Sequence, residues 1–149
     1  MRSQRKIEVG LAPYSAAVLE TIPLSELFLR PGEEFLYLEF QGEEGERPIR
    51  FFNEFFPVRY KEYQLPSPRI RKRIFKDENG VFHLELSTDK PAFFVFAEFR
   101  GIRAVFSDNS FTLLPDRPRD LTFRTDGELS AAELEKALIV RDLRGSYEE

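Results

Sequence analysis

The feature that most constrains this chain is the alternation of apolar and polar residues within short runs. From Phe82 to Ser87, Phe, Leu and Leu take one set of alternate positions, and His, Glu and Ser take the other. Because successive side chains of a strand point to opposite faces, this period is typical of a strand with one buried face. The run 69–76 precedes it across Asp77-Glu-Asn-Gly80, and Asn-Gly readily supplies the positive φ values of a tight turn. The pattern predicts an antiparallel hairpin.

Other β-rich runs are separated by turn-forming residues. Strands are predicted over 16–24, 33–41, 48–56, 92–99, 112–114, 121–125 and 138–143. Pro66 and Pro68 cannot donate ladder hydrogen bonds, so 60–68 is expected to be an extended connection between sheets. A Ser-x-x-Glu capping box predicts one short helical turn near Ser130–Lys136. About eight or nine short strands with hardly any helix predict an all-β antiparallel sandwich.

One run is almost entirely apolar. In 92–99, Phe93, Val95, Ala97 and Phe99 share one face, and Phe94 and Phe96 share the other. Strands that are apolar on both sides are usually covered on both faces. We therefore expect this strand to be central and the best buried of the sandwich.

Length and composition bound the class of protein. A chain of 149 residues fits one domain, expected over 16–149 with 1–15 as a lead-in. The net charge of -4 opposes nucleic-acid binding, and no segment approaches the ~18 apolar residues of a membrane span. The chain contains no Cys, which removes disulfides and thiolate metal sites. With no signal-like segment either, a cytoplasmic location is favoured.

The sequence offers no constellation for catalysis. His83 is the one histidine, so no second histidine or cysteine completes a metal site or a triad, and it is predicted to lie on the surface. Adjacent glutamates such as Glu33-Glu34 lie in turns, where a solvated face is expected. Glycine-rich phosphate loops and nucleophile elbows are missing. We predict no catalytic residue, no cofactor and no metal.

A basic run stands out against the acidic composition. Alternation places Arg69, Arg71 and Arg73 on one side of a strand. Such a patch suits heparin or RNA, or it blunts an exposed sheet edge against aggregation. The overall negative charge favours the sheet edge.

Aromatic residues are abundant, with 16 Phe and 5 Tyr but no Trp. Alternation puts Phe51 and Phe55 on one face and Phe52 and Phe56 on the other. Three uses are open for them: core, an interface between domains, or a platform for stacking sugars. The candidate interface or sugar-contact residues are Phe51, Phe55, Tyr60 and Tyr63.

Three stretches, within 53–68, 106–111 and 121–143, together resemble the C-terminal immunoglobulin-like domain of β-mannosidases, in the large β-galactosidase-type glycoside hydrolase clan (family 2). Phe106-Ser-Asp-Asn-Ser-Phe111 is similar to the family's Phe-Ser-Asp-Asn-x-Phe signature, and it follows an apolar strand here as it does there. The order of Leu121–Phe123, Glu133–Lys136 and Ile139–Leu143 is similar to the family's closing strand, Glu-Leu-Glu segment and final strand. Upstream, Asn53-Glu-Phe-Phe-Pro57, Lys61 and Leu65-Pro-Ser-Pro68 resemble its Asn-x-Phe-Phe-x-Pro-x-Lys and Leu-Pro-x-Pro stretches.

The resemblance implies an immunoglobulin-like β-sandwich with no catalytic role of its own. The parent would be a retaining β-mannosidase that hydrolyses terminal β-D-mannose with two glutamates on a barrel absent from this chain. This chain would pack on that barrel and stabilise it, with Phe51, Phe55 and Tyr60 shaping the rim of the glycan site. Ser107, Asp108, Asn109 and Phe111 form the expected structural turn, because Asp and Asn side chains bond nearby backbone. The alternatives are a carbohydrate-binding module for mannan or manno-oligosaccharides, and a free-standing enzyme.

Overall fold

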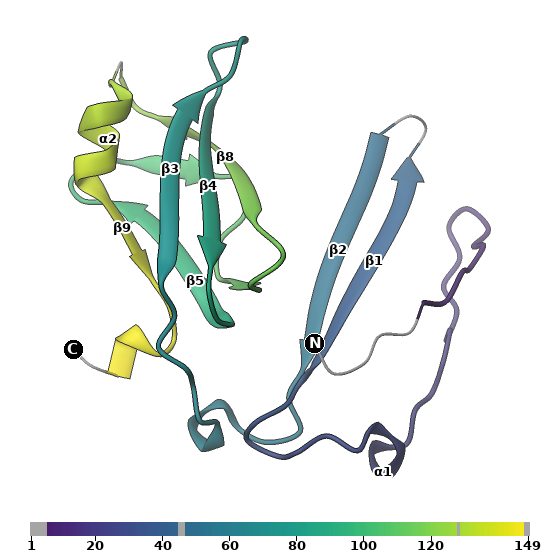
Figure 1. The fold of residues 1–149 in the computed structure, drawn as a ribbon. Helices are drawn as coiled ribbons and strands as arrows, with labels where there is room; N and C mark the ends of the chain where they lie inside the picture. Colours follow the sequence, from purple (N-terminus) through teal and green to yellow (C-terminus); the bar gives the residue numbers. More distant parts are fainter. Residues whose placement is uncertain (1–5, 45–46, 128, 148–149) are drawn as a thin grey trace. The chain divides into compact units, whose positions relative to one another are not determined.

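The computed structural model describes residues 6–44, 47–127 and 129–147. They form two compact units, Met1–Tyr63 and Gln64–Glu149, and the segment 60–68 contains the junction (Figure 1). The predicted domain 16–149 spans both units and stays a prediction, and the first five residues of the predicted lead-in lie outside the described part. None of the described helices is long and apolar enough to span a bilayer.

Gln64–Glu149 is an antiparallel β-sandwich of a four-stranded and a three-stranded sheet, which confirms the predicted fold class (Figure 1). The four-stranded sheet runs in the order β3 (Ile70–Lys76), β4 (Phe82–Thr88), β8 (Arg119–Thr125) and β6 (Ala104–Phe106). The three-stranded sheet runs in the order β7 (Phe111–Leu113), β5 (Ala92–Phe99) and β9 (Leu138–Arg141).

The core of this unit lies between its two sheets. Leu84 and Leu86 from β4 and Leu121 from β8 are almost fully buried, as are Val95 from β5 and Leu113 from β7. These residues belong to one contiguous cluster. β4 and β8 therefore contribute alternate side chains to a shared layer, as the period-two pattern requires.

The hairpin β3–β4 confirms the prediction, with a difference in its loop. Gly80 has φ +79°, whereas Asn79 keeps a negative φ, so one positive φ closes the loop instead of an Asn-Gly pair. The Asp77 carboxylate accepts the backbone N–H groups of Asn79 (3.0 Å) and Val81 (2.7 Å). This side-chain cap supplies bonds that a two-residue turn would have made through the backbone.

The helix α2 (Ala131–Ala137) begins at the predicted capping box. The Glu133 N–H donates to Ser130 Oγ (3.3 Å), and the Ser130 N–H donates to the Glu133 carboxylate (2.9 Å). Leu134 is fully buried and joins the core. A short helical turn η2 (Gly145–Tyr147) follows β9.

The expectation that β5 is covered on both faces is wrong. β5 is central in its sheet, but Phe94 and Phe96 are 39% and 40% exposed. The three-stranded sheet packs its inner face on the other sheet, and the rings at 94 and 96 belong to its outer face. The pairing with β7 shifts between Ala92 and Val95, and Phe94 takes φ +51° at this bulge.

In Met1–Tyr63, β1 (Leu36–Glu44) and β2 (Arg47–Phe55) pair antiparallel in unbroken register. They correspond to the predicted strands 33–41 and 48–56, with shifted bounds. The unit also contains two short helical turns, α1 (Leu24–Leu27) and η1 (Tyr60–Glu62).

The predicted strand over 16–24 is wrong. Val18 is 84% exposed and Leu19 is 49% exposed, and no described strand pairs with this segment. A strand needs a partner to satisfy its backbone groups, and local β propensity does not supply one.

Replacing Leu84 by Ala should lower the free energy of unfolding of Gln64–Glu149 by about 3 kcal/mol, because a fully buried leucine leaves a cavity between the sheets. Urea denaturation monitored on this unit measures the loss. Val105→Ala is the matched control, since Val105 is 68% exposed and should change stability by less than about 0.5 kcal/mol. Equal losses in both variants would contradict this placement of the core.

Candidate functional site

The turn Ser107–Ser110, which we call the signature turn, connects β6 to β7 and holds three strands together. Ser107 bonds to β8 twice: its N–H donates to the Thr122 carbonyl (2.8 Å), and its hydroxyl accepts the Thr122 N–H (3.1 Å). Just before it, the Phe106 ring packs on Phe99 and Phe123, with centroids 5.5 and 5.2 Å away. The first part of the turn is therefore fixed on both its polar and its apolar side.

The Asn109 side chain replaces a missing stretch of sheet ladder. Its Oδ1 accepts the Ala97 N–H (2.8 Å), and its Nδ2 donates to the Ala97 carbonyl (2.9 Å). These two bonds satisfy both backbone groups of one β5 residue, beyond the point where the β5–β7 register ends at Val95 and Phe111. Ser110, at φ +58°, then turns the chain into β7. A side-chain amide has a separate donor and acceptor, so it can bond the N–H and the carbonyl of one residue at the same time.

Asp108 and Phe111 both contact the guanidinium of Arg119. The Asp108 carboxylate accepts a hydrogen bond from Arg119 Nη2 (2.5 Å), and the same guanidinium lies 4.8 Å above the Phe111 ring centroid. Phe111 is 8% exposed and belongs to the core. The structure thus brings Ser107, Asp108, Asn109 and Phe111 together as one turn that binds β5, β7 and β8.

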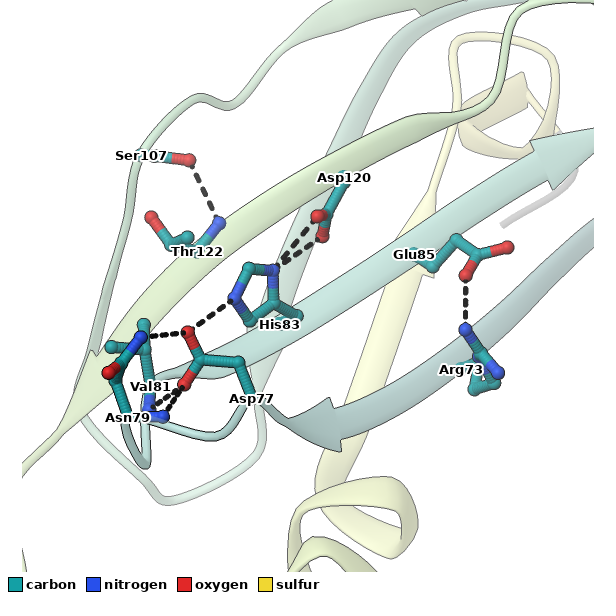
Figure 2. Close-up of polar contacts among 9 residues, drawn as sticks. All are labelled: Arg73, Asp77, Asn79, Val81, His83, Glu85, Ser107, Asp120 and Thr122. Carbon is teal, nitrogen blue, oxygen red and sulfur yellow. Dashed lines mark hydrogen bonds and ion pairs between the residues drawn. The ribbon is translucent and has the colours of Figure 1, made fainter.

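The sequence did not reveal a bridge centred on His83. Figure 2 shows His83 between Asp120 of β8 and Asp77 of the β3–β4 loop. Its Nδ1 lies 2.9 Å from Asp120 Oδ2, its Nε2 lies 3.7 Å from Asp77 Oδ2, and its ring stacks on Phe75 at 5.0 Å. The side chain is 17% exposed, so the expected surface histidine is in fact largely covered. Because β4 and β8 are far apart in sequence, their pairing could not be foreseen.

This bridge has the geometry of a structural tie. A carboxylate accepts hydrogen bonds, so Nδ1 carries the proton toward Asp120. The described residues contain no group of three or more His, Asp or Glu side chains arranged to hold a metal ion. The hydrogen bond between His83 and Asp120 ties β4 to β8 within the four-stranded sheet.

The basic run lies on an edge strand. β3 is the outermost strand of the four-stranded sheet, and Arg71, Lys72 and Arg73 are exposed. Arg73 pairs with Glu85 of β4 at 2.7 Å, which Figure 2 shows. Exposed cations on an edge hinder pairing with another sheet, as the sheet-edge interpretation requires.

The aromatic candidates fall into two groups in Met1–Tyr63. Phe51 is 62% exposed, with its ring 6.3 Å from Phe40, and Phe55 is partly exposed on the same side of the hairpin. Tyr60 and Tyr63 instead contact Phe56 edge-on, at 4.7 and 5.4 Å.

The two tyrosines differ in hydrogen bonding and in exposure. The Tyr63 hydroxyl donates to the Glu34 carbonyl (2.9 Å), whereas Tyr60 is 40% exposed. None of the four predicted interface or sugar-contact residues is buried.

A second exposed aromatic pair was not foreseen. Phe94 and Phe96 lie on the outer face of β5, beside the ion pair of Glu98 with Arg141 on β9. The all-apolar run of β5 concealed this pair, because it was interpreted as burial on both faces. The positive φ of Phe94 needs the three-dimensional pairing with β7 to be recognised.

Comparison with family models matches residues 65–146 to Ig_mannosidase, an Ig-fold domain. The matched range covers more than half of the chain and contains every strand of the sandwich. The comparison with curated proteins gave no match. The match identifies the sandwich as an Ig-fold domain, as the signature turn indicated, and supports an accessory role for it.

Asn109→Ala should lower the free energy of unfolding of the sandwich by about 1–3 kcal/mol, because it leaves the Ala97 N–H and carbonyl without partners. Urea denaturation measures the loss, and hydrogen exchange should speed up at the Ala97 amide. Asn53→Ala removes an exposed amide from the other unit and serves as control. An unchanged Ala97 exchange rate would contradict the assigned role.

Acid should weaken the sandwich through the β3–β4 loop. The Val81 N–H, above all, lowers the pKa of Asp77 below its ordinary value. Because the folded pKa is depressed, this contribution is present above the unfolded value of about 3.9 and is lost as pH falls through the folded one. Asp77→Asn should therefore lower the urea midpoint at pH 6, and the deficit should shrink below about pH 3. A deficit that stays constant with pH would rule out this linkage.

Proposed function

Because the chain belongs to the Ig-fold domain family of mannosidases, we propose that it is a non-catalytic accessory module of a β-mannosidase, packing on the catalytic barrel and stabilising it. The sandwich buries a core of its own, so its contribution to a parent enzyme would come through its surface. The polar groups of Ser107, Asp108 and Asn109 hold strands together and are bonded within the domain.

The observation that carries the proposal is the bulge at Phe94. A bulky residue at φ +51° costs about 1–2 kcal/mol of backbone strain. Bulges commonly re-aim side chains, and strain of this kind gathers at functional positions. Here the strained residue leaves an aromatic ring exposed on β5, as Phe96 does two residues further along the strand.

The surroundings of these rings suit a contact between domains. Phe94 and Phe96 supply an apolar centre, and the ion pair of Glu98 with Arg141 supplies polar groups beside it. Interfaces typically have this arrangement of an aromatic centre and a polar rim. We place the main contact with the barrel at this face of β5.

The predicted residues of the other unit fit a secondary role. Phe51 and Tyr60 are exposed and remain proposed contacts near the glycan site, together with Phe55. The alternative of a mannan-binding module has weaker support. The exposed rings of Phe40 and Phe51 are tilted by 36° to each other, and Tyr63 already uses its hydroxyl, so no flat platform is formed by these residues.

Phe94→Gly tests the proposal in two settings. In the isolated chain, glycine adopts φ +51° without strain, which offsets the lost side-chain contacts, so stability should change by no more than about 1 kcal/mol. In the parent enzyme, the same change should lower the temperature of half-inactivation toward nitrophenyl β-mannoside by several degrees, because an aromatic anchor is lost. Val105→Ala is the control and should leave both unchanged.

Two outcomes would contradict the proposal. One is a parent enzyme whose inactivation temperature does not respond to Phe94→Gly. The other is nitrophenyl β-mannoside hydrolysis by the purified chain, which we expect to be inactive. Calorimetric binding of manno-oligosaccharides that is lost in Tyr60→Ala would instead support the carbohydrate-binding alternative.

A further inference from the structure

One side of the hairpin β1–β2 carries mostly apolar residues, with the polar Asn53 among them. The register places alternate residues of both strands on the same side. We call this side the hairpin apolar face, and its large side chains are Leu36, Leu38, Phe40, Ile49, Phe51 and Phe55. Leu38, Phe40 and Phe51 are 47%, 40% and 62% exposed.

The opposite side of the hairpin carries charged and amide residues, together with one aromatic pair, Tyr37 and Phe52, whose ring centroids are 5.7 Å apart. Glu39 pairs with Arg50 at 3.3 Å and accepts a hydrogen bond from Gln41 at 2.7 Å, while Glu43 is exposed. Such alternation belongs to a sheet that packs one face on another layer. Among the described residues of Met1–Tyr63, however, Gly32 alone is buried. The layer that should cover the apolar face is therefore not supplied within this unit.

The two edges of the hairpin differ. β2 carries Pro48, which has no N–H to donate, and Arg50. β1 has no proline, lysine or arginine, and its nine residues pair with β2 without a bulge. Natural edge strands usually carry such protection, and an unprotected edge is a template for another strand. β1 is therefore the less protected edge of this hairpin, with glutamates as its only charged residues.

We propose that β1 pairs with the edge strand of a partner β-sandwich, and that the second sheet of that sandwich packs on the hairpin apolar face. The partner strand would place apolar residues beside Leu38 and Phe40. Its other side would carry lysine or arginine beside Glu43, which is exposed, whereas Glu39 already pairs with Arg50. This inference goes beyond the proposed function and does not depend on it.

A helical partner would cover the apolar face but would not pair with the edge of β1. It would leave the outward N–H and carbonyl groups of β1 without a protein partner. A strand satisfies those groups and extends the apolar face at the same time. A two-stranded hairpin is also marginal in water, and additional strands make such a sheet stable.

The test measures hydrogen exchange of the full chain with a synthetic nine-residue peptide that alternates lysine and valine, matching the length of β1. The control peptide has the same composition in blocks. We expect the alternating peptide to slow exchange of the β1 amides about tenfold and to leave β4 unchanged. Phe40→Lys should abolish this protection, whereas Val105→Lys, on an exposed position of β6, should retain it.

Three results would overturn the inference. Protection by the block peptide as strong as by the alternating one would show charge attraction alone. Protection by an amphipathic helical peptide of similar charge would show a helical partner, and protection that rises with chain concentration without peptide would show a second copy. Phe94→Gly should leave the peptide effect intact, so failure here and failure of the proposed function are distinguishable.

Discussion

The packing of the two sheets of Gln64–Glu149 on each other is the interaction on which the rest of this structure depends. Leucines of β4 and β8 face Val95 of β5 and Leu113 of β7, and this layer excludes water. The signature turn is useful because that layer exists. Asn109 bonds both backbone groups of Ala97 in β5, and Asp108 holds Arg119 over Phe111. Both contacts therefore fix strands that the core has already brought together.

Local patterns were enough to predict the elements whose information is contiguous in sequence. The β3–β4 hairpin and the capped helix α2 were predicted because their turn residues, their caps and their apolar period all lie within short windows. The signature turn could be placed for the same reason. The strand expected over 16–24 failed because a strand is defined by a partner, and the local pattern contains no information about one.

The features that sequence reasoning missed depend on pairing between distant segments. His83 meets Asp120 because β4 pairs with β8, and Phe94 turns outward because the register of β5 with β7 shifts beside it. Apolar character alone could not separate the two faces of β5, since Phe occupies both. The outer face of β5 stays exposed because the three-stranded sheet has only one other sheet in the sandwich to pack against.

The two units differ in how their sheet edges are protected against the addition of a strand. In the sandwich, the edge strands β6, β7 and β9 have three or four residues each, and the longer edge β3 presents exposed Arg71, Lys72 and Arg73. Each of these devices hinders the addition of a strand. β1 has none of them, although it is longer than all four. A chain that protects the edges of its sandwich and leaves one edge of its hairpin open has separated a self-contained domain from the edge that we propose for a partner strand.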